Sequence, residues 1–177
     1  KNIVTRKIKT AAKMRALKVI RTRINNDQTK YGLAYGNLYG TRIEDEEISF
    51  ALNDVYKIHA VYESENDADA SSPYMVLSES TFFDNGSVVV GKTSGARGRV
   101  IQFINSTLKL YFVALNEIPF IPGETIDGVD DDGVPLVAII DDSEGSVATG
   151  SKVITTQFEL EGGQKAHFYD VCKLTRL

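Results

Sequence analysis

The chain has 177 residues, of which 42% are hydrophobic and 25% charged, and its formal net charge is −4. This length and composition are typical of one or two globular domains with a buried core, and no apolar run reaches the roughly 18 residues of a membrane-spanning helix. The single cysteine excludes an internal disulfide. Because the sequence begins with lysine rather than methionine, we expect a fragment or a processed product of a longer chain.

The first 24 residues form a basic segment. Nine of the 20 basic residues lie in the first 23 positions, which contain no acid, whereas the rest of the chain carries 11 basic and 24 acidic residues, a net charge of 11 − 24 = −13. The segment has no aromatic residue that would stack on nucleic-acid bases. We therefore expect a structural arm, either a helix or an extended chain, that packs on an acidic neighbour or on its own body. Contact with nucleic acid or with a membrane surface is the alternative.

Residues 1–39 are predicted to be this arm followed by a bridge rich in Tyr-Gly pairs. We expect the tyrosine rings to pack over glycines, and a platform on which a ligand stacks is the alternative. The four acids of residues 44–47 come next. Adjacent acids in a strand point to opposite faces, so we interpret them as a solvated edge rather than a cation site.

Residues 40–78 and 152–177 are predicted to form one β framework. Apolar and polar residues alternate along residues 48–62, interrupted by an Asn-Asp turn, and again along residues 154–160. A period of two indicates half-buried strands, so we expect a sandwich-like arrangement. Gly163 shares its expected turn with a second glycine and is therefore predicted to tolerate alanine.

Residues 79–151 are predicted to form an inserted small β-barrel module of two repeated hairpin units. A shift of 37 residues places Phe83, Gly86 and Gly91 on Phe120, Gly123 and Gly128, so that each copy reads F-x-x-G-x-x-[VI]-x-G. The same shift places Val100 on Val137, in the return strand of each copy. We expect at least one glycine of each pair to have a positive φ or to approach another backbone closely. Chance similarity of two glycine-bounded strands is the alternative.

Residues 86–93 match the phosphate-binding P-loop pattern G-x-x-x-x-G-K-T. A P-loop curls its backbone N–H groups round a phosphate and then enters a helix. Three consecutive valines favour an extended chain instead, and Gly95 and Gly98 fall where the first helical turns would be. We therefore predict a strand, a turn and a second strand, with nucleotide binding as a weaker alternative.

No catalytic, cofactor or metal site is predicted. His59 and His167 lack a spaced partner, and Cys172 lies in an apolar run where a core position is expected. The acidic run 127–133 fails the calcium-loop pattern, because an isoleucine occupies the place of the bidentate acid. Asn105 begins an N-glycosylation sequence at an expected hairpin tip. This sequence indicates glycosylation only in a secreted protein, and no secretion signal is present.

Several stretches resemble very large virion structural proteins of contractile-tailed bacteriophages, especially those of marine cyanobacteria. These stretches are residues 40–49, 54–64, 91–96 and 163–170, within a resemblance that covers about residues 30–177. The turn at 91–96 is similar to the end of an F-x-x-G-E-x-V-x-G-x-T-S-G-A repeat, and Lys165 replaces arginine in a G-Q-R-x-x-F-Y-D segment. The resemblance implies a tail, baseplate or fibre component built from repeated β modules.

We therefore expect a non-enzymatic structural protein of the virion tail, assembled in the host cytoplasm, that acts in virion assembly or host attachment. Its expected partners are other virion proteins, in a homo-oligomer or a large assembly, and a host-surface glycan. A carbohydrate- or peptide-binding β module is the alternative, and exposed aromatic residues on a concave face would favour it.

Overall fold

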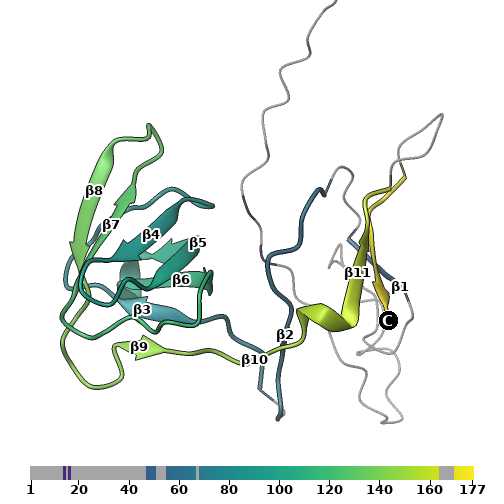
Figure 1. The fold of residues 1–177 in the computed structure, drawn as a ribbon, viewed down its shortest axis with the longest axis horizontal. Helices are drawn as coiled ribbons and strands as arrows, with labels where there is room; N and C mark the ends of the chain where they lie inside the picture. Colours follow the sequence, from purple (N-terminus) through teal and green to yellow (C-terminus); the bar gives the residue numbers. More distant parts are fainter. Residues whose placement is uncertain (1–13, 15, 17–46, 51–54, 67, 164–169) are drawn as a thin grey trace, which may run out of the picture. The chain divides into compact units, whose positions relative to one another are not determined.

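A computed structural model describes residues 14, 16, 47–50, 55–66, 68–163 and 170–177. These residues are mainly β, in antiparallel sheets, and none of them lies in an α-helix (Figure 1). Except for Met14 and Ala16, the basic arm and the Tyr-Gly bridge lie outside the described residues.

The chain divides into two compact units, which we call unit 1 and unit 2. Of the described residues, unit 1 contains Met14 and residues 75–147, and unit 2 contains Ala16 and residues 47–50, 55–66, 68–74, 148–163 and 170–177. The boundaries of residues 75–147 lie four residues before the ends expected for the inserted module, which were 79 and 151.

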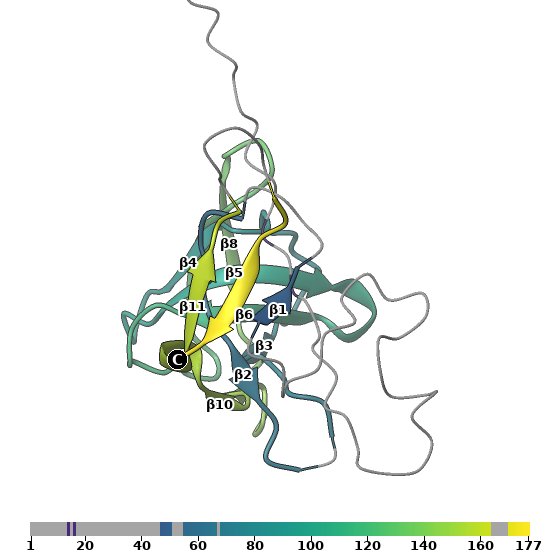
Figure 2. The same ribbon diagram turned by 90° about the vertical axis from the view of Figure 1, so that its right-hand side faces the viewer.

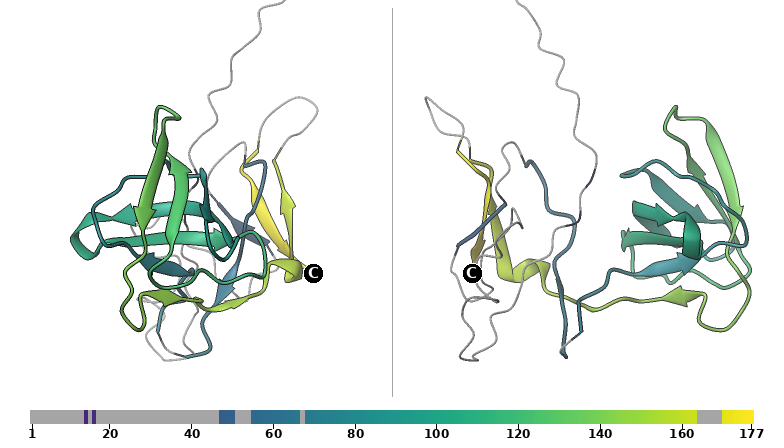
Figure 3. Two further views of the ribbon diagram at one scale, coloured as in Figure 1. Left: turned by 60° about the vertical axis from the view of Figure 1, so that its left-hand side comes forward. Right: turned by 180° about the vertical axis from the view of Figure 1, so that it is seen from behind.

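Unit 1 is built on a seven-stranded sheet with the strand order β8-β7-β4-β5-β6-β3-β9. Its elements are β3 (Tyr74–Val76), β4 (Val88–Gly91), β5 (Arg97–Ile104), the 3-10 turn η1 (Asn105–Thr107), β6 (Lys109–Ala114), β7 (Thr125–Val129), β8 (Pro135–Ile139) and β9 (Val147–Ala148). Figure 3 shows the green β7–β8 hairpin running across the teal strands β5 and β6, so the sheet is strongly curled. The predicted hairpin with Asn105 at its tip is confirmed.

The curled sheet is not a closed barrel. An isolated bridge between Leu77 and Ile140 joins the chain after β3 to the chain after β8. The Ser78 N–H donates to the Ile139 carbonyl beside this bridge, at 2.9 Å. In the described part of the chain the bridge does not extend into a strand ladder, so the expected barrel closure is not confirmed.

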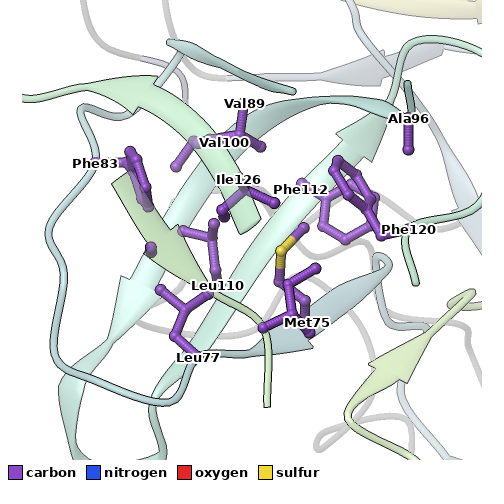
Figure 4. Packing of buried hydrophobic residues seen from close by; sticks show 12 residues of the cluster. Met75, Leu77, Phe83, Val89, Ala96, Val100, Leu110, Phe112, Phe120 and Ile126 are labelled. Atoms are coloured by element: carbon purple, nitrogen blue, oxygen red, sulfur yellow. The ribbon is translucent and has the colours of Figure 1, made fainter. Parts of the chain in front are cut away.

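One apolar cluster forms the core of unit 1 (Figure 4). Its buried members are Met75, Leu77, Phe83, Val89, Ala96, Val100, Leu110, Phe112, Phe120, Ile126, Ala138 and Ile140. The rings of Phe112 and Phe120 meet edge to face at a centroid distance of 5.1 Å. An irregularity between Val100 and Gln102 interrupts the β5–β6 register, and it lets Val100 and Ile101 both be buried although they are adjacent.

Within unit 1, the two copies of the 37-residue repeat have the same backbone geometry at their first glycine. Gly86 and Gly123 have φ values of +92° and +78°, as expected for one glycine of each pair. Phe83 and Phe120, three residues earlier, are 4% and 5% exposed. The strands that follow, β4 and β7, pair with each other in antiparallel orientation. The 37-residue repeat is therefore a structural repeat.

The return strands match as well, with a different offset. In each copy one buried residue of the return strand exchanges backbone hydrogen bonds with the glycine and with the residue after it. These bonds join Val100 to Gly86 and Ser87 in the first copy, and Ile140 to Gly123 and Glu124 in the second. Val137, the predicted equivalent of Val100, is 56% exposed. That alignment is wrong, because the offset here is 140 − 100 = 40 rather than 37: the paired strands of the second hairpin extend further before the chain turns.

Unit 2 contains two smaller sheets. Its elements are β1 (Glu47–Ser49), β2 (Tyr62–Glu63), β10 (Lys152–Val153), the 3-10 turn η2 (Thr155–Gln157), β11 (Phe158–Glu161) and β12 (Lys173–Arg176). The strand orders are β1-β12-β11, seen face-on in Figure 2, and β10-β2. The buried cluster here contains Ile48, Phe50, Cys172 and Leu174, so the predicted core position of Cys172 is confirmed.

Part of the predicted alternation in unit 2 does not form strands. Residues 55–61 have no strand pairing, and residues 51–54 lie outside the described part of the chain. The Val55 N–H donates to Cys172 Sγ at 3.1 Å, and the Val61 N–H donates to Thr155 Oγ1 at 2.9 Å. These side-chain acceptors replace the partners that a neighbouring strand would supply, so the segment keeps its apolar contacts without a ladder.

The two ends of the insert are held close together. Within unit 1 the Val76 N–H donates to the Ser146 carbonyl, and within unit 2 the Ser151 N–H donates to the Ser71 carbonyl, each at 2.7 Å. Gly150 has a φ of +76°, and a Cβ atom on it would lie 2.5 Å from Pro73 N. The chain therefore leaves and re-enters unit 2 at adjacent points, as an insertion requires.

Gly163 is the glycine for which the sequence-based prediction is wrong. It has a φ of +66°, and a Cβ atom there would overlap the Asp170 carbonyl oxygen, whereas the nearest atom to a Cβ on Gly162 is the Val55 oxygen at 3.7 Å. We expect Gly163→Ala to lower the free energy of unfolding by about 2 kcal/mol, because both the dihedral strain and the backbone overlap resist it. Gly162→Ala is expected to stay within about 0.5 kcal/mol of the wild type. Urea denaturation of the full chain makes the comparison, and equal costs at the two positions would contradict it.

Candidate functional site

The Gly91–Ala96 turn, which contains the P-loop-like sequence, is a tight connection between β4 and β5. The Gly91 N–H donates to the Ala96 carbonyl at 2.9 Å, and the Gly95 N–H donates to the Gly91 carbonyl at 3.0 Å. Gly95 has a φ of +74°. The strand β5 begins directly after Ala96, where a P-loop would enter a helix. The predicted order of strand, turn and strand is confirmed.

The carboxylate of Glu124 fills the inside of this turn. Its Oε2 accepts the N–H groups of Thr93 and Ser94, at 3.2 and 3.0 Å. Its Oε1 accepts the Ser94 hydroxyl and the Ile121 N–H, both at 2.8 Å. We call this group of contacts the Glu124 latch, and it joins the turn of the first repeated unit to the start of the second.

Glu124 is a buried charged group that is well compensated. Glu124 is only 4% exposed. Burial acts to raise the pKa of its carboxyl group, but the N–H groups of Ser94, Ile121 and Thr93 and the Ser94 hydroxyl together lower the pKa below its ordinary value of 4.5. The latch is therefore held by the ionised carboxylate, whose hydrogen bonds are stronger than those of neutral groups.

The latch explains why Gly91 has no side chain. A Cβ atom on Gly91 would lie 2.5 Å from Ser94 Oγ and 2.6 Å from one Glu124 carboxylate oxygen. Contacts of this length essentially never occur for a real Cβ atom. The second glycine of this repeated strand thus leaves the space that the carboxylate occupies.

Lys92 does not face the inside of the turn as a P-loop lysine faces a phosphate. Its Nζ pairs with Asp127 Oδ1 at 3.0 Å, and both side chains are about half exposed. Its backbone N–H donates to the Thr125 carbonyl at 2.9 Å. The N–H groups of Thr93 and Ser94 already serve Glu124, so the turn resembles a phosphate cradle that an internal carboxylate occupies.

The other residues singled out in the sequence are not brought together. His59 lies in unit 2, and His167 and the acids at 44–46 lie outside the described residues. The acidic turn after β7 is self-contained, because Asp130 Oδ1 accepts the N–H groups of Asp132 and Val134, at 2.9 and 2.8 Å. In the described part of the chain, no group of three or more potential metal ligands is present.

Unit 2 has a shallow hollow of about 290 Å³ with an aromatic rim. Tyr56, Lys57, Thr155 and Phe158 contribute to its lining, together with apolar residues of β11 and β12. Tyr56 is 80% exposed, so much of its ring faces solvent. The residues that line this hollow are far in sequence from the Gly91–Ala96 turn. The alternation of apolar and polar residues along 48–62 and 154–160 does not indicate a hollow there.

Comparison of the chain with protein-family models, curated proteins and solved structures finds no match in any of the three. Among the residues that the structure describes, no helix has the length and apolar character needed to cross a membrane.

Proposed function

We propose that this chain is a β-rich structural domain of a contractile-tailed bacteriophage virion, in a tail, baseplate or fibre component. The observation that carries the proposal is the Glu124 latch. In the turn that most resembles a ligand site, the donors of Thr93 and Ser94 bind a carboxylate of the same chain. Such a site stiffens the module and leaves its polar groups satisfied, which suits a component that transmits load or holds neighbours in place.

The repeat supports the same role. Two hairpins, each preceded by a glycine of positive φ and joined to each other by Glu124, form a self-contained block between paired chain ends. Within this proposal the curled sheet of unit 1 acts as a small barrel, and unit 2 acts as a sandwich-like framework that carries it. Partners are then other virion proteins, in a homo-oligomer or a larger assembly.

Mass spectrometry of purified virions from the phage that encodes this sequence tests the role directly. We expect peptides from both units to occur in the virion, at a fixed ratio to a known tail protein. A phage preparation whose tails are complete and lack these peptides would contradict the proposal.

The hollow in unit 2 favours a second function, binding of a carbohydrate. An exposed tyrosine ring beside a lysine and a threonine offers a stacking surface with nearby hydrogen-bonding groups. A glycan array probed with the full chain tests this function. Glycan binding that Tyr56→Ala abolishes would support carbohydrate binding. An array without signal would contradict carbohydrate binding and leave the structural role as the only proposed function.

The nucleotide alternative gives a clear negative expectation. Lys92→Ala removes an ion pair between two half-exposed side chains, so we expect the free energy of unfolding to change by less than about 0.5 kcal/mol. We also expect no heat of ATP or GTP binding in calorimetry of the wild-type chain. Nucleotide binding that disappears in Lys92→Ala would overturn the interpretation of the turn.

A further inference from the structure

The Gly91–Ala96 turn is held in shape by hydrogen bonds that do not involve Glu124. Asn116, in the loop after β6, contacts the turn through its side chain. Its Oδ1 accepts the Arg97 N–H at 3.0 Å, and its Nδ2 donates to the Gly95 carbonyl at 3.1 Å. The end of the turn is therefore clamped by a side chain from another loop, and the clamp is independent of the glutamate.

The main chain also places the N–H group of Ile121, the donor that comes from the second repeated unit. The Glu124 N–H donates to the Ile121 carbonyl at 3.2 Å, so residues 121–124 form a turn of their own. Ile140 holds this second turn, because its N–H donates to the Glu124 carbonyl at 2.9 Å and its carbonyl accepts the Gly123 N–H at 3.1 Å. None of these bonds uses the Glu124 side chain, so they remain when that side chain is removed.

The donors of the two turns suit a flat anion with two oxygens. One carboxylate oxygen of Glu124 accepts the N–H groups of Thr93 and Ser94. The other oxygen accepts the Ile121 N–H and the Ser94 hydroxyl. The Ala96 N–H donates to Ser94 Oγ at 3.0 Å, which directs the hydroxyl hydrogen toward the carboxylate. The donors are thus aimed at two oxygen positions before any ligand is chosen.

A carboxylate fits this space better than a phosphate does. A phosphate is tetrahedral, so it would bring further oxygens to donors that are arranged for two. In a P-loop a lysine serves such oxygens, but Lys92 pairs with Asp127 instead. A Cβ atom on Gly91 would lie 2.6 and 2.7 Å from the two carboxylate oxygens, so the backbone closes the space on that side. The matching ligand class is therefore a small monocarboxylate.

We propose that the Gly91–Ala96 turn is a binding site for a small carboxylate, in which the Glu124 side chain is the resident ligand. The turn forms the site with its own backbone and with Asn116, and the glutamate occupies it. A free monocarboxylate then binds when the glutamate side chain is absent. The site does not depend on the virion role, since it concerns only the chemistry of the turn.

Formate and a glycine at position 124 are the matched probe and variant. The carbon of a bound formate would take the place of Cδ of Glu124, which lies three bonds and roughly 3.8 Å from Cα. That separation is an ordinary contact between carbon atoms. An alanine would leave a Cβ atom only about 2.5 Å from the formate carbon, which is too close. Glu124→Gly therefore leaves room for formate, and Glu124→Gln keeps the space filled by an uncharged amide.

Urea denaturation of Glu124→Gly at pH 7 tests the site. We expect 0.5 M sodium formate to raise the ratio of folded to unfolded chain about tenfold over 0.5 M sodium chloride, which corresponds to a dissociation constant on the order of 50 mM. In Glu124→Gln the same comparison should give less than about a twofold change, because formate finds no space. Equal changes in the two variants would show a general salt effect and overturn the proposal. A Glu124→Gly chain that stays unfolded in formate would overturn it as well, because the turn would then need the glutamate for its shape.

An NMR titration of ¹⁵N-labelled Glu124→Gly locates the bound formate. We expect the amide signals of Thr93, Ser94 and Ile121 to shift and to saturate at the dissociation constant found by denaturation. The amides of Asp132 and Val134 are the internal control, because they donate to a carboxylate in the other hairpin and should not shift. Shifts spread evenly over both hairpins would contradict the site. Saturable shifts with phosphate but not with formate would overturn the assignment to a carboxylate.

Discussion

Alanine at Gly91 is expected to lower the free energy of unfolding of unit 1 by about 3 kcal/mol, because its Cβ atom and the Glu124 carboxylate cannot occupy the same space. The ideal Cβ position lies 2.5 to 2.7 Å from Ser94 Oγ and from both carboxylate oxygens. Either the carboxylate leaves the turn, and buried N–H groups lose their acceptor, or the turn itself opens. Hydrogen exchange of the β4 and β5 amides measures the loss within unit 1.

Gly133→Ala provides the control for backbone strain. Gly133 has a φ of +79°, and a Cβ atom there would meet nothing within 4 Å. Its cost is therefore the dihedral strain of a left-handed residue alone, about 1 kcal/mol. If Gly91→Ala lowers the free energy of unfolding no more than Gly133→Ala does, the Glu124 carboxylate does not need the space left by the absent Gly91 side chain. The latch would then be weaker than its geometry indicates.

The repeat was predictable from the sequence because each copy encodes it locally. A positive φ at Gly86 and Gly123 and a buried Phe83 and Phe120 follow from residues that lie next to each other in the chain. Turn chemistry and burial of this kind recur wherever the same short pattern recurs. The glycine spacing therefore located two matching hairpins before any contact between them was known.

The Glu124 latch was not predictable in the same way. Glu124 and Ser94 are 30 residues apart, and neither periodicity nor composition shows which turn will face which carboxylate. The repeat offered one signal, because the aligned position holds Ser87 in the first copy and a glutamate in the second. A charged residue at a position that turned out to be buried required a partner, and the glycine-rich turn was the nearest source of unpaired N–H groups.

Two features of the molecule differ from the sequence-based predictions for physical reasons. The predicted match of Val137 with Val100 fails because the paired strands extend further in the second hairpin than in the first, and apolar residues do not show where a hairpin turns. Residues 55–61 alternate as a strand does, but side-chain acceptors on Cys172 and Thr155 satisfy two of their N–H groups. The alternation does not report which side chains face the core either, because Val55, Ile58 and Val61 pack against it whereas Tyr56 is 80% exposed.

Removal of the Glu124 carboxylate is expected to be the second large effect. Glu124→Ala leaves the N–H groups of Thr93, Ser94 and Ile121 without their acceptor, so we expect the free energy of unfolding to fall by about 3 kcal/mol at pH 7. Ser87→Ala is the matched control, because Ser87 occupies the equivalent position in the first copy and its hydroxyl donates one hydrogen bond, to the Asp84 carbonyl. Its loss should cost about 1 kcal/mol. Similar costs for the two variants would show that the latch adds nothing beyond an ordinary side-chain contact.

The pH dependence of the same variant separates the charge of Glu124 from its packing. The folded chain lowers the pKa of this carboxyl below 4.5, so the unfolded chain takes up the proton first as the pH falls. The stabilisation is therefore complete above the ordinary value and disappears as the pH falls through the lower folded value. The difference in unfolding free energy between the wild type and Glu124→Ala should stay constant from neutral pH down to about pH 5 and then shrink on further acidification. The other carboxylates titrate in both proteins and cancel in this difference. A difference that persists undiminished in strong acid would mean that the glutamate acts through its shape, and that the turn does not require a bound anion.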